Sequence, residues 1–492
     1  MRRAMHLIGT CTIFLTGWQL TACTNRQDST VEVVAIGSPE TDFKTTGQLS
    51  TGAQLLLGAT AQGLVALDEQ AQVIPGLADR WIVTDDGLSY IFRLRDGNWP
   101  DGSTLTAESA RAALRSAING LQGSALARDL ADISDIRVMT GRVIELRLTH
   151  PRPELLMLLA QPELGLLQRG RGGGPMQIKR DKNVAILSLL DPEELGLPAV
   201  PNWQDRTREL HLRALPASVA LARFNHGEAS VVLGGTIEQF PLVDAAGLSR
   251  GTVQLDPVIG LFGLAVVHDD GFLADPANRE AIALAIDRQG MIAALGFSGW
   301  TPTTRIVASG IEDDPGGVPD RWATMGMAER QALATARVAR WRDGKAEPVH
   351  LRLALPQGPG ADIMFARLAA DLARVGLVAV RVGLDEAADL RLIDAVARYP
   401  RIGWFFNQLS CEGQRSLCSD EADALADQAD SAPDPATRSA LLSRAETKLT
   451  EANVFIPFGP PIRWSLVRGD TTGFVANPLG YHPLMPLAMR PK

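Results

Sequence analysis

Two glycine-containing patterns and a set of histidines are the places where this 492-residue chain could do chemistry. Gly247, Ser249 and Gly251 match the G-x-S-x-G pattern of a hydrolase, in which Ser249 would be the nucleophile. Such an elbow needs a strand before the serine and a helix after it. Residues 252–257 instead indicate an extended segment that ends at a proline. An exported hydrolase using Ser249 is therefore the least favoured function.

The glycine-rich segment 170–174 is the second pattern, and the histidines are the third candidate. Backbone N–H groups of the glycines could hold a phosphate, but Pro175 has no N–H and no helix is expected after it. The seven histidines are scattered, and those after residue 100 do not share one face of a helix. The sequence predicts no local metal site, no cofactor and no catalytic residue, although distant histidines could still converge in the fold.

The first 23 residues determine where the protein goes. A basic start and an apolar run over 7–20 are typical of an export signal, and the run is too short to span a bilayer. Residues 20–23, Leu-Thr-Ala-Cys, resemble the lipobox of bacterial lipoproteins, in which the cysteine is acylated after cleavage. An ordinary signal peptide is the alternative. We expect a signal peptide over 1–22, lipid on Cys23 and a polar tether over 23–30.

Cys411 and Cys418 are the pair that remains, because Cys11 leaves with the signal peptide and Cys23 carries lipid. An exported chain reaches an oxidising compartment, so a disulfide between the two is the default expectation, and two free thiols are the alternative. A ring this short contributes about 2–3 kcal/mol by the loop-closure estimate. That is enough to rigidify a loop but not to hold a domain together.

Charge and length narrow the class of protein. The formal net charge is −8, and the chain after the signal peptide carries 46 basic against 56 acidic residues. Nucleic acid is therefore excluded as an expected partner. The length corresponds to about three domain-sized units, and a hydrophobic content of 46% is ample for large cores.

Helical and strand patterns alternate along the chain, which predicts a mixed α/β fold. Residues 78–95 indicate a β-hairpin around the turn at 85–87, and Thr106 is placed to cap the next helix. Further expected elements are helices over 217–225, from Asp275, over 363–372 and from Asp434, and strands over 230–233, 378–382 and 454–456.

Several stretches, in this order, are similar to the signature of a known family. They are PGLADRW at 75–81, DGLSYIFRLRDG at 86–97, DGSTLTAE at 101–108, GGP at 173–175, DPANREAIALAIDR at 275–288 and a C-terminal match over 456–474. Because the order is kept from about residue 50 to 490, the chain resembles the peptide/nickel-binding family of extracellular solute-binding proteins, family 5.

The resemblance implies a two-lobe periplasmic-binding-protein fold of type II, large, with an added subdomain in lobe one. The implied division is lobe one over 31–262 and 462–492 with its subdomain at about 75–162, and lobe two over 263–461. Its members capture a small solute between the lobes for an ABC importer, so we expect a periplasmic, lipid-anchored monomer that meets an ABC permease. No enzyme activity is expected. The alternative is a ligand-free or sensory scaffold lipoprotein that kept the fold.

One segment departs from the family's peptide binders, in which an acid near a tryptophan of lobe two holds the ligand's amine. The corresponding segment looks like 403–411, which keeps Trp404 and has Asn407 but no acid. A buried, unpaired ammonium costs on the order of several kcal/mol, so a peptide held by its amine is expected to bind weakly. Trp404 and its neighbours are expected on a strand, either facing the cleft or in the core. The expected ligand contacts are Trp404, Phe405, Asn407, Trp464 and His268.

Overall fold

The structure is a computed structural model, which describes residues 30–490 except 48, 249, 250, 298, 312, 315, 317, 346 and 415. The expected signal peptide, Cys23, its tether up to residue 29, and Ser249 therefore lie outside the described residues. Within the described part of the chain, no helix is both long and apolar enough to cross a membrane.

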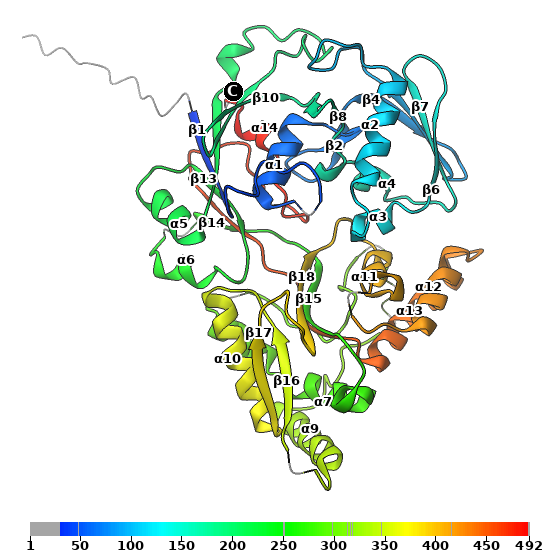
Figure 1. The fold of residues 1–492 in the computed structure, drawn as a ribbon, viewed down its shortest axis with the longest axis vertical. Helices are drawn as coiled ribbons and strands as arrows, with labels where there is room; N and C mark the ends of the chain where they lie inside the picture. The colour runs from blue at the N-terminus through cyan, green and yellow to red at the C-terminus, as the bar shows by residue number, and fades with distance from the viewer. Residues whose placement is uncertain are drawn as a thin grey trace, which may run out of the picture.

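Two mixed β-sheets form the centres of two lobes (Figure 1). The first has the strand order β10-β11-β12-β1-β13-β20-β14 and the second β17-β16-β18-β15-β19. The strands of the first are β1 Thr30–Ile36, β10 Met176–Asp181, β11 Val184–Leu189, β12 Glu209–Leu215, β13 Val231–Gly235, β14 Val253–Leu255 and β20 Trp464–Val467. Those of the second are β15 Gly260–Val266, β16 Val349–Ala354, β17 Leu377–Val382, β18 Leu390–Val396 and β19 Phe455–Gly459. The expected mixed α/β, two-lobe fold is confirmed.

The chain passes between the two sheets twice. It leaves the first sheet after β14 and enters the second at β15, and it returns between β19 and β20. The expected boundary at 262/263 falls inside β15, because Gly260 already pairs with Val396 of β18. A side chain at 260 would place its Cβ 2.0 Å from the carbonyl oxygen of Ala395. Only glycine therefore fits this entry point, which lies next to the lobe interface.

A smaller antiparallel sheet, β4-β5-β7-β6, belongs to the added subdomain. The expected hairpin and the following helix are both present, and Thr106 caps that helix by accepting from the N–H of Ser109 at 3.2 Å. The subdomain's elements are β4 Ala78–Val83, β5 Ser89–Leu94, β6 Ile133–Val138, β7 Val143–Leu148, α2 Ala107–Asn119, α3 Ala125–Asp129 and α4 Leu155–Leu159.

The remaining helices flank the sheets. In α7 and α13 the expected caps Asp275 and Asp434 accept from backbone N–H groups, and proline follows each cap. These helices are α1 Thr51–Thr60, α5 Ala217–Asn225, α6 Pro241–Ala245, α7 Pro276–Ala285, α8 Arg288–Ala294, α9 Met327–Arg342, α10 Pro359–Arg374, α11 Ile402–Leu409, α12 Asp420–Asp430, α13 Pro435–Ala452 and α14 Leu484–Leu487.

The expected strand around Trp404 is wrong, because these residues form helix α11. Ile402, Phe405, Phe406 and Leu409 follow the i, i+3, i+4, i+7 spacing of one helix face, and all four are buried. The aromatic run 404–406 suggested the alternation of a strand. The i, i+3, i+4, i+7 spacing of the apolar residues over 402–409 is the pattern that indicates a helix.

The two lobes are packed together. One hydrophobic cluster contains Leu126 and Leu130 of the subdomain together with Trp404 and Phe405 of lobe two. In Figure 1, α3 lies directly against α11, and the two helices are in contact. The described arrangement is therefore a closed one.

Candidate functional site

A cavity of about 800 Å³ lies between the lobes. Its volume falls in the range of about 300–1,000 Å³ that is typical of small-molecule sites. Lobe one contributes Thr51 and Gln54 of α1, the loop 120–126, Gln161 and the 3₁₀ turn Pro162–Leu164, residues 233–236 near β13, and the C-terminal segment 479–482. Lobe two contributes Asp394 to Arg398 at the end of β18, and Trp404 and Gln408 of α11, while Arg463 comes from the second crossing.

Asp394 and Arg463 form an ion pair in the cavity wall. Nη1 of Arg463 donates to both carboxylate oxygens of Asp394, at 2.9 and 3.1 Å. Burial raises the pKa of Asp394, and the nearby guanidinium of Arg463 acts against that rise. The pair joins the end of β18 to the crossing segment, so it fixes lobe two against the chain that returns to lobe one.

Glu163 and Arg398 form a second pair, which crosses the cavity between the lobes. Nη2 of Arg398 donates to Oε1 of Glu163 at 3.1 Å, and Nε2 of Gln54 donates to the same oxygen at 3.2 Å. Nη1 of Arg398 also donates to Gln161 at 3.2 Å. The other oxygen, Oε2 of Glu163, is buried and has no hydrogen-bond partner among the described residues. The carboxylate therefore keeps one acceptor unused.

A third polar cluster lies where α3 meets α11, beside the cavity. Nε of Arg128 donates to Oδ1 of Asn407 at 3.1 Å, and Nδ2 of Asn407 donates to Asp129. The hydroxyl of Tyr399 donates to the same carboxylate at 2.9 Å. Burial raises the pKa of Asp129, and burial followed by the nearby Asp129 charge raises the pKa of Tyr399 well above its ordinary value. Asn407 thus uses both ends of its amide within the protein.

Of the five residues expected to contact a ligand, Trp404 lines the cavity. Its side chain is buried, and its Nε1 has no hydrogen-bond partner within the described part of the chain. Phe405 lies in the core with its ring perpendicular to that of Trp404 at 5.1 Å. Asn407 belongs to the α3–α11 cluster and is not among the residues that line the cavity.

Trp464 and His268 are not among the described residues that line the cavity. Trp464 is buried in the core, where its Nε1 donates to the carbonyl of Thr236 at 2.8 Å. His268 follows β15 at the end opposite the cavity and contacts Asp389 through Nε2 at 2.8 Å. Within the described residues, no group of three or more His, Cys, Asp or Glu side chains could hold a metal ion.

Sequence reasoning missed the charged residues of the wall. Asp394 lies near the end of strand β18 and Arg398 comes just after it, at the lobe interface, and that position could have pointed to them. Glu163 and Arg463 carry no such signal, because Glu163 lies in the turn Pro162–Leu164 and Arg463 follows a proline-containing segment, and both resemble many others.

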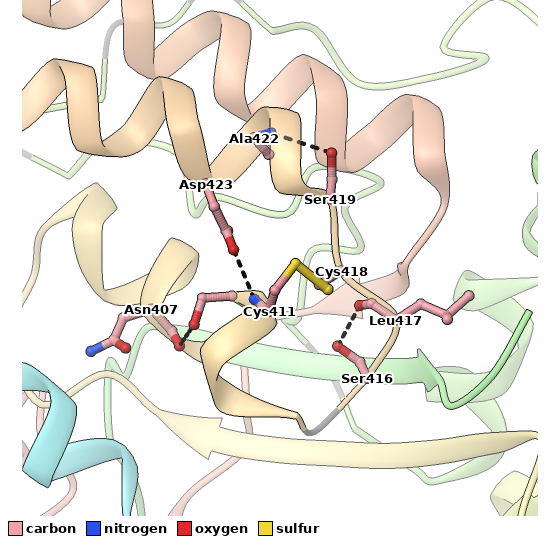
Figure 2. Close-up of a disulfide and its surroundings, with 9 residues drawn as sticks. Asn407, Cys411, Ser416, Leu417, Cys418, Ser419, Ala422 and Asp423 are labelled. Atoms are coloured by element: carbon pink, nitrogen blue, oxygen red, sulfur yellow. Dashed lines mark hydrogen bonds between the residues drawn. A yellow bond between two sulfur atoms is a disulfide. The ribbon is translucent and has the colours of Figure 1, made fainter.

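Cys411 and Cys418 are joined as a disulfide in the loop after α11 (Figure 2), with an S–S distance of 2.20 Å. The N–H of Cys411 donates to Oδ2 of Asp423 in α12 at 2.8 Å. The N–H of Leu417 donates to the carbonyl of Val266 in β15 at 2.6 Å. The loop is therefore held to two neighbouring elements as well as by its own bridge.

Comparisons with known proteins agree with this architecture. The model of the bacterial extracellular solute-binding proteins, family 5, middle region, matches residues 72–394. A probable di/tripeptide-binding protein of Pseudomonas aeruginosa is 24% identical over 85% of this chain and 87% of the relative. A glutathione-binding protein of Salmonella typhi is 26% identical over 57% of this chain and 56% of its own length.

Other curated relatives match over shorter stretches. A probable deoxycholate-binding periplasmic protein of Escherichia coli is 34% identical over 23% of this chain and 25% of its own length. The chain thus spans between a quarter and about three-fifths of the length of the curated relatives from Escherichia coli and Salmonella that it matches.

Solved structures share the fold over nearly the whole chain. The murein tripeptide-binding protein of Escherichia coli has a TM-score of 0.80 and 17% identity, and covers 94% of this chain and 99% of its own. An oligopeptide-binding protein of Haemophilus influenzae in complex with the peptide RPPGFSPFR has a TM-score of 0.79, 17% identity and the same coverage. At this identity, the likeness concerns the fold alone.

Proposed function

This chain belongs to the bacterial extracellular solute-binding proteins of family 5, and on that premise we propose that it captures a small polar solute for an ABC importer. The observation that carries the proposal is the cavity of about 800 Å³, whose wall is built from both lobes. The protein would bind and release its solute without making or breaking a covalent bond, and would present the closed form to an ABC permease.

The charged wall suggests how closure and binding are linked. Arg398 reaches Glu163 from the opposite lobe, so this contact forms only when the lobes come together. Closure also removes water, which strengthens each remaining polar contact with a solute. A solute that contacts both walls would therefore stabilise the closed arrangement.

The wall also changes the expected class of solute. The sequence disfavoured a free amine because 403–411 contains no acid at the position of Asn407. The cavity wall, however, carries Glu163 and Asp394 from other segments, together with Arg398 and Arg463. Because both signs of charge line the cavity, we propose a solute with donor and acceptor groups, such as a di- or tripeptide or glutathione.

Calorimetry and thermal shift on the Cys23→Ser protein test this proposal. The panel contains di- and tripeptides, glutathione and deoxycholate. We expect at least one peptide-like compound to bind saturably with a Kd below about 100 μM, which corresponds to about 5.5 kcal/mol. If no compound binds or raises the melting temperature, solute capture of this class is wrong.

The alternative scaffold role also has an observation in its favour. The lobes are packed together through α3 and α11, and Asn407 bonds to Arg128 and Asp129 across this contact. A scaffold would stay closed and bind nothing. Small-angle scattering of the ligand-free protein, with and without the panel, separates the two roles, because a capture protein opens and then contracts on binding.

Membrane attachment is a separate part of the proposal. The family is periplasmic or extracellular, and the segment 20–23 motivates lipid on Cys23. The wild-type protein should enter the detergent phase in a phase split, and Cys23→Ser should stay in the aqueous phase. Aqueous partition of both forms would contradict acylation.

A further inference from the structure

A small side pocket of about 60 Å³ adjoins the main cavity. Glu163 lines both spaces, together with Gly47, Leu49, Gly120 and Leu121. At about 10–15 Å³ for each water molecule, the side pocket has room for roughly four to six waters. It can therefore accept a short arm of a solute that occupies the main cavity.

Glu163 stands in the shared wall with one oxygen unused. Its side chain is only 7% exposed, and both Arg398 and Gln54 bond to Oε1. Oε2 has almost no accessible surface and no hydrogen-bond partner among the described residues, so a donor in the side pocket reaches it once the carboxylate turns toward the pocket. A buried carboxylate oxygen without a donor is unfavourable. A solute group that donates to it therefore gains the hydrogen bond and also removes this cost.

The other walls of the side pocket suit a hydrocarbon chain. Ala113 and Ala117 of α2, Leu121 and Leu167 supply apolar surface, and Thr45, Thr46 and Ser116 supply hydroxyls. No lysine, arginine or histidine is among the described residues that line the pocket. Glu163 is the one charged residue among these lining residues, and its partner Arg398 lies outside the lining of the side pocket.

We propose that the solute carries a cationic arm, a primary ammonium or a guanidinium on a short aliphatic chain, which enters this side pocket and donates to Oε2 of Glu163. The inference rests on the proposed capture of a small solute and names the chemistry of one part of it. Arg398 keeps its bond to Oε1, so the carboxylate bridges the lobe-two arginine and the solute. A charge-assisted bond of this kind is stronger than a neutral one.

Matched tripeptides test the proposal. Lysine is placed at each position of trialanine, and norleucine, which ends in methyl instead of ammonium, replaces it in the control peptides. The wild type should bind one lysine peptide at least about tenfold more tightly than its norleucine counterpart. Glu163→Gln should reduce that ratio to near one, whereas the exposed Glu347→Gln should keep it.

A second variant guards against a loss caused by misfolding. Glu163→Asp keeps the charge but shortens the side chain, so it should fold and give an intermediate ratio. Equal binding of lysine and norleucine peptides by the wild type would overturn the inference while leaving solute capture intact. So would a lysine preference that survives in Glu163→Gln.

A fragment soak covers the case in which no tripeptide binds. Crystals of the wild type are soaked with n-butylamine or with neutral n-butanol. We expect the ammonium group of butylamine within hydrogen-bond distance of Oε2 of Glu163, and neither butanol in the wild type nor butylamine in Glu163→Gln at that place. An empty side pocket in the wild-type butylamine crystal would overturn the inference whatever the peptides do.

Discussion

Two of the polar contacts that join the lobes, one between α3 and α11 and one at the cavity wall, differ in how much hydrogen-bonding capacity they leave over. At the α3–α11 contact, Asn407 accepts from Arg128 and donates to Asp129, so its amide is used at both ends. At the cavity wall, Glu163 bonds to Arg398 through one oxygen and keeps the other unused. The first contact holds the lobes together, and the second has capacity left for a solute.

This difference separates closure from recognition. Substitutions at the α3–α11 contact should change how firmly the lobes close, with little effect on which solute is chosen. Substitutions at the wall should change the choice of solute. Substitutions at the two contacts and in the segments beside them can therefore break or sharpen this separation.

Arg463→Ala should destabilise the protein most, because it leaves Asp394 buried without its cation. The side chain of Asp394 is only 10% exposed, and both of its oxygens bond to Arg463. Removing one partner of a buried pair costs about 3–5 kcal/mol. Urea unfolding measures the loss. Adding Asp394→Asn to Arg463→Ala should recover part of it; no recovery would mean that Arg463 acts through packing rather than charge.

Loss of the disulfide should have the next largest effect. Replacing Cys411 and Cys418 with serine should lower the free energy of unfolding by about 2–3 kcal/mol. The loop follows α11 directly, so the α3–α11 contact should loosen while the cavity wall keeps its preference for solutes. Mass mapping without reduction checks the bridge itself. Two alkylatable thiols in protein taken from the exporting compartment would contradict it.

Asn407→Asp should weaken the α3–α11 contact. It replaces an amide that donates to Asp129 with a second carboxylate beside a buried one, at a cost of about 1–2 kcal/mol. If Asn407 faced the ligand instead, the same change would tighten the binding of free-amine peptides. Calorimetry with a peptide and its N-acetylated form distinguishes the two: a selective gain for the free amine would place Asn407 in the ligand site.

The fold was predictable because its signals are local, whereas most of the site was not. Capping residues such as Thr106, Asp275 and Asp434 mark helix starts within a few residues of sequence, and each caps a helix in the structure. The cavity wall instead joins segments such as Glu163 and Arg398, which are 235 residues apart. No periodicity links residues at that separation. Trp404 was found because an aromatic residue at the lobe interface was expected from the family resemblance.

The smallest expected effect on stability concerns the start of α1, whose residues Thr51 and Gln54 line the cavity. Just before this helix, Oγ of Ser50 donates to the buried Asp42 at 3.2 Å. Burial raises the pKa of Asp42 to about 6, although the bond from Ser50 acts against that rise. The folded protein therefore favours the protonated carboxyl more than the unfolded chain does.

Because the pKa of Asp42 is higher in the folded state, its contribution to stability is greatest below its unfolded pKa and is lost as the pH rises through about 6. Between pH 5 and pH 7 we expect this residue to reduce the free energy of unfolding by about 1 kcal/mol. Asn resembles the protonated side chain, so Asp42→Asn should remove that part of the slope, and the difference between the two proteins isolates Asp42 from other buried acids. If the free energy of unfolding, measured with urea, changes equally with pH in the wild type and in Asp42→Asn, then Asp42 is ionised in the folded protein at both pH values. Solute affinity measured at both pH values should then show whether the protonation of Asp42 affects the part of the cavity wall that α1 forms. A change of affinity with pH in the wild type that Asp42→Asn abolishes would extend the recognition site to the start of α1.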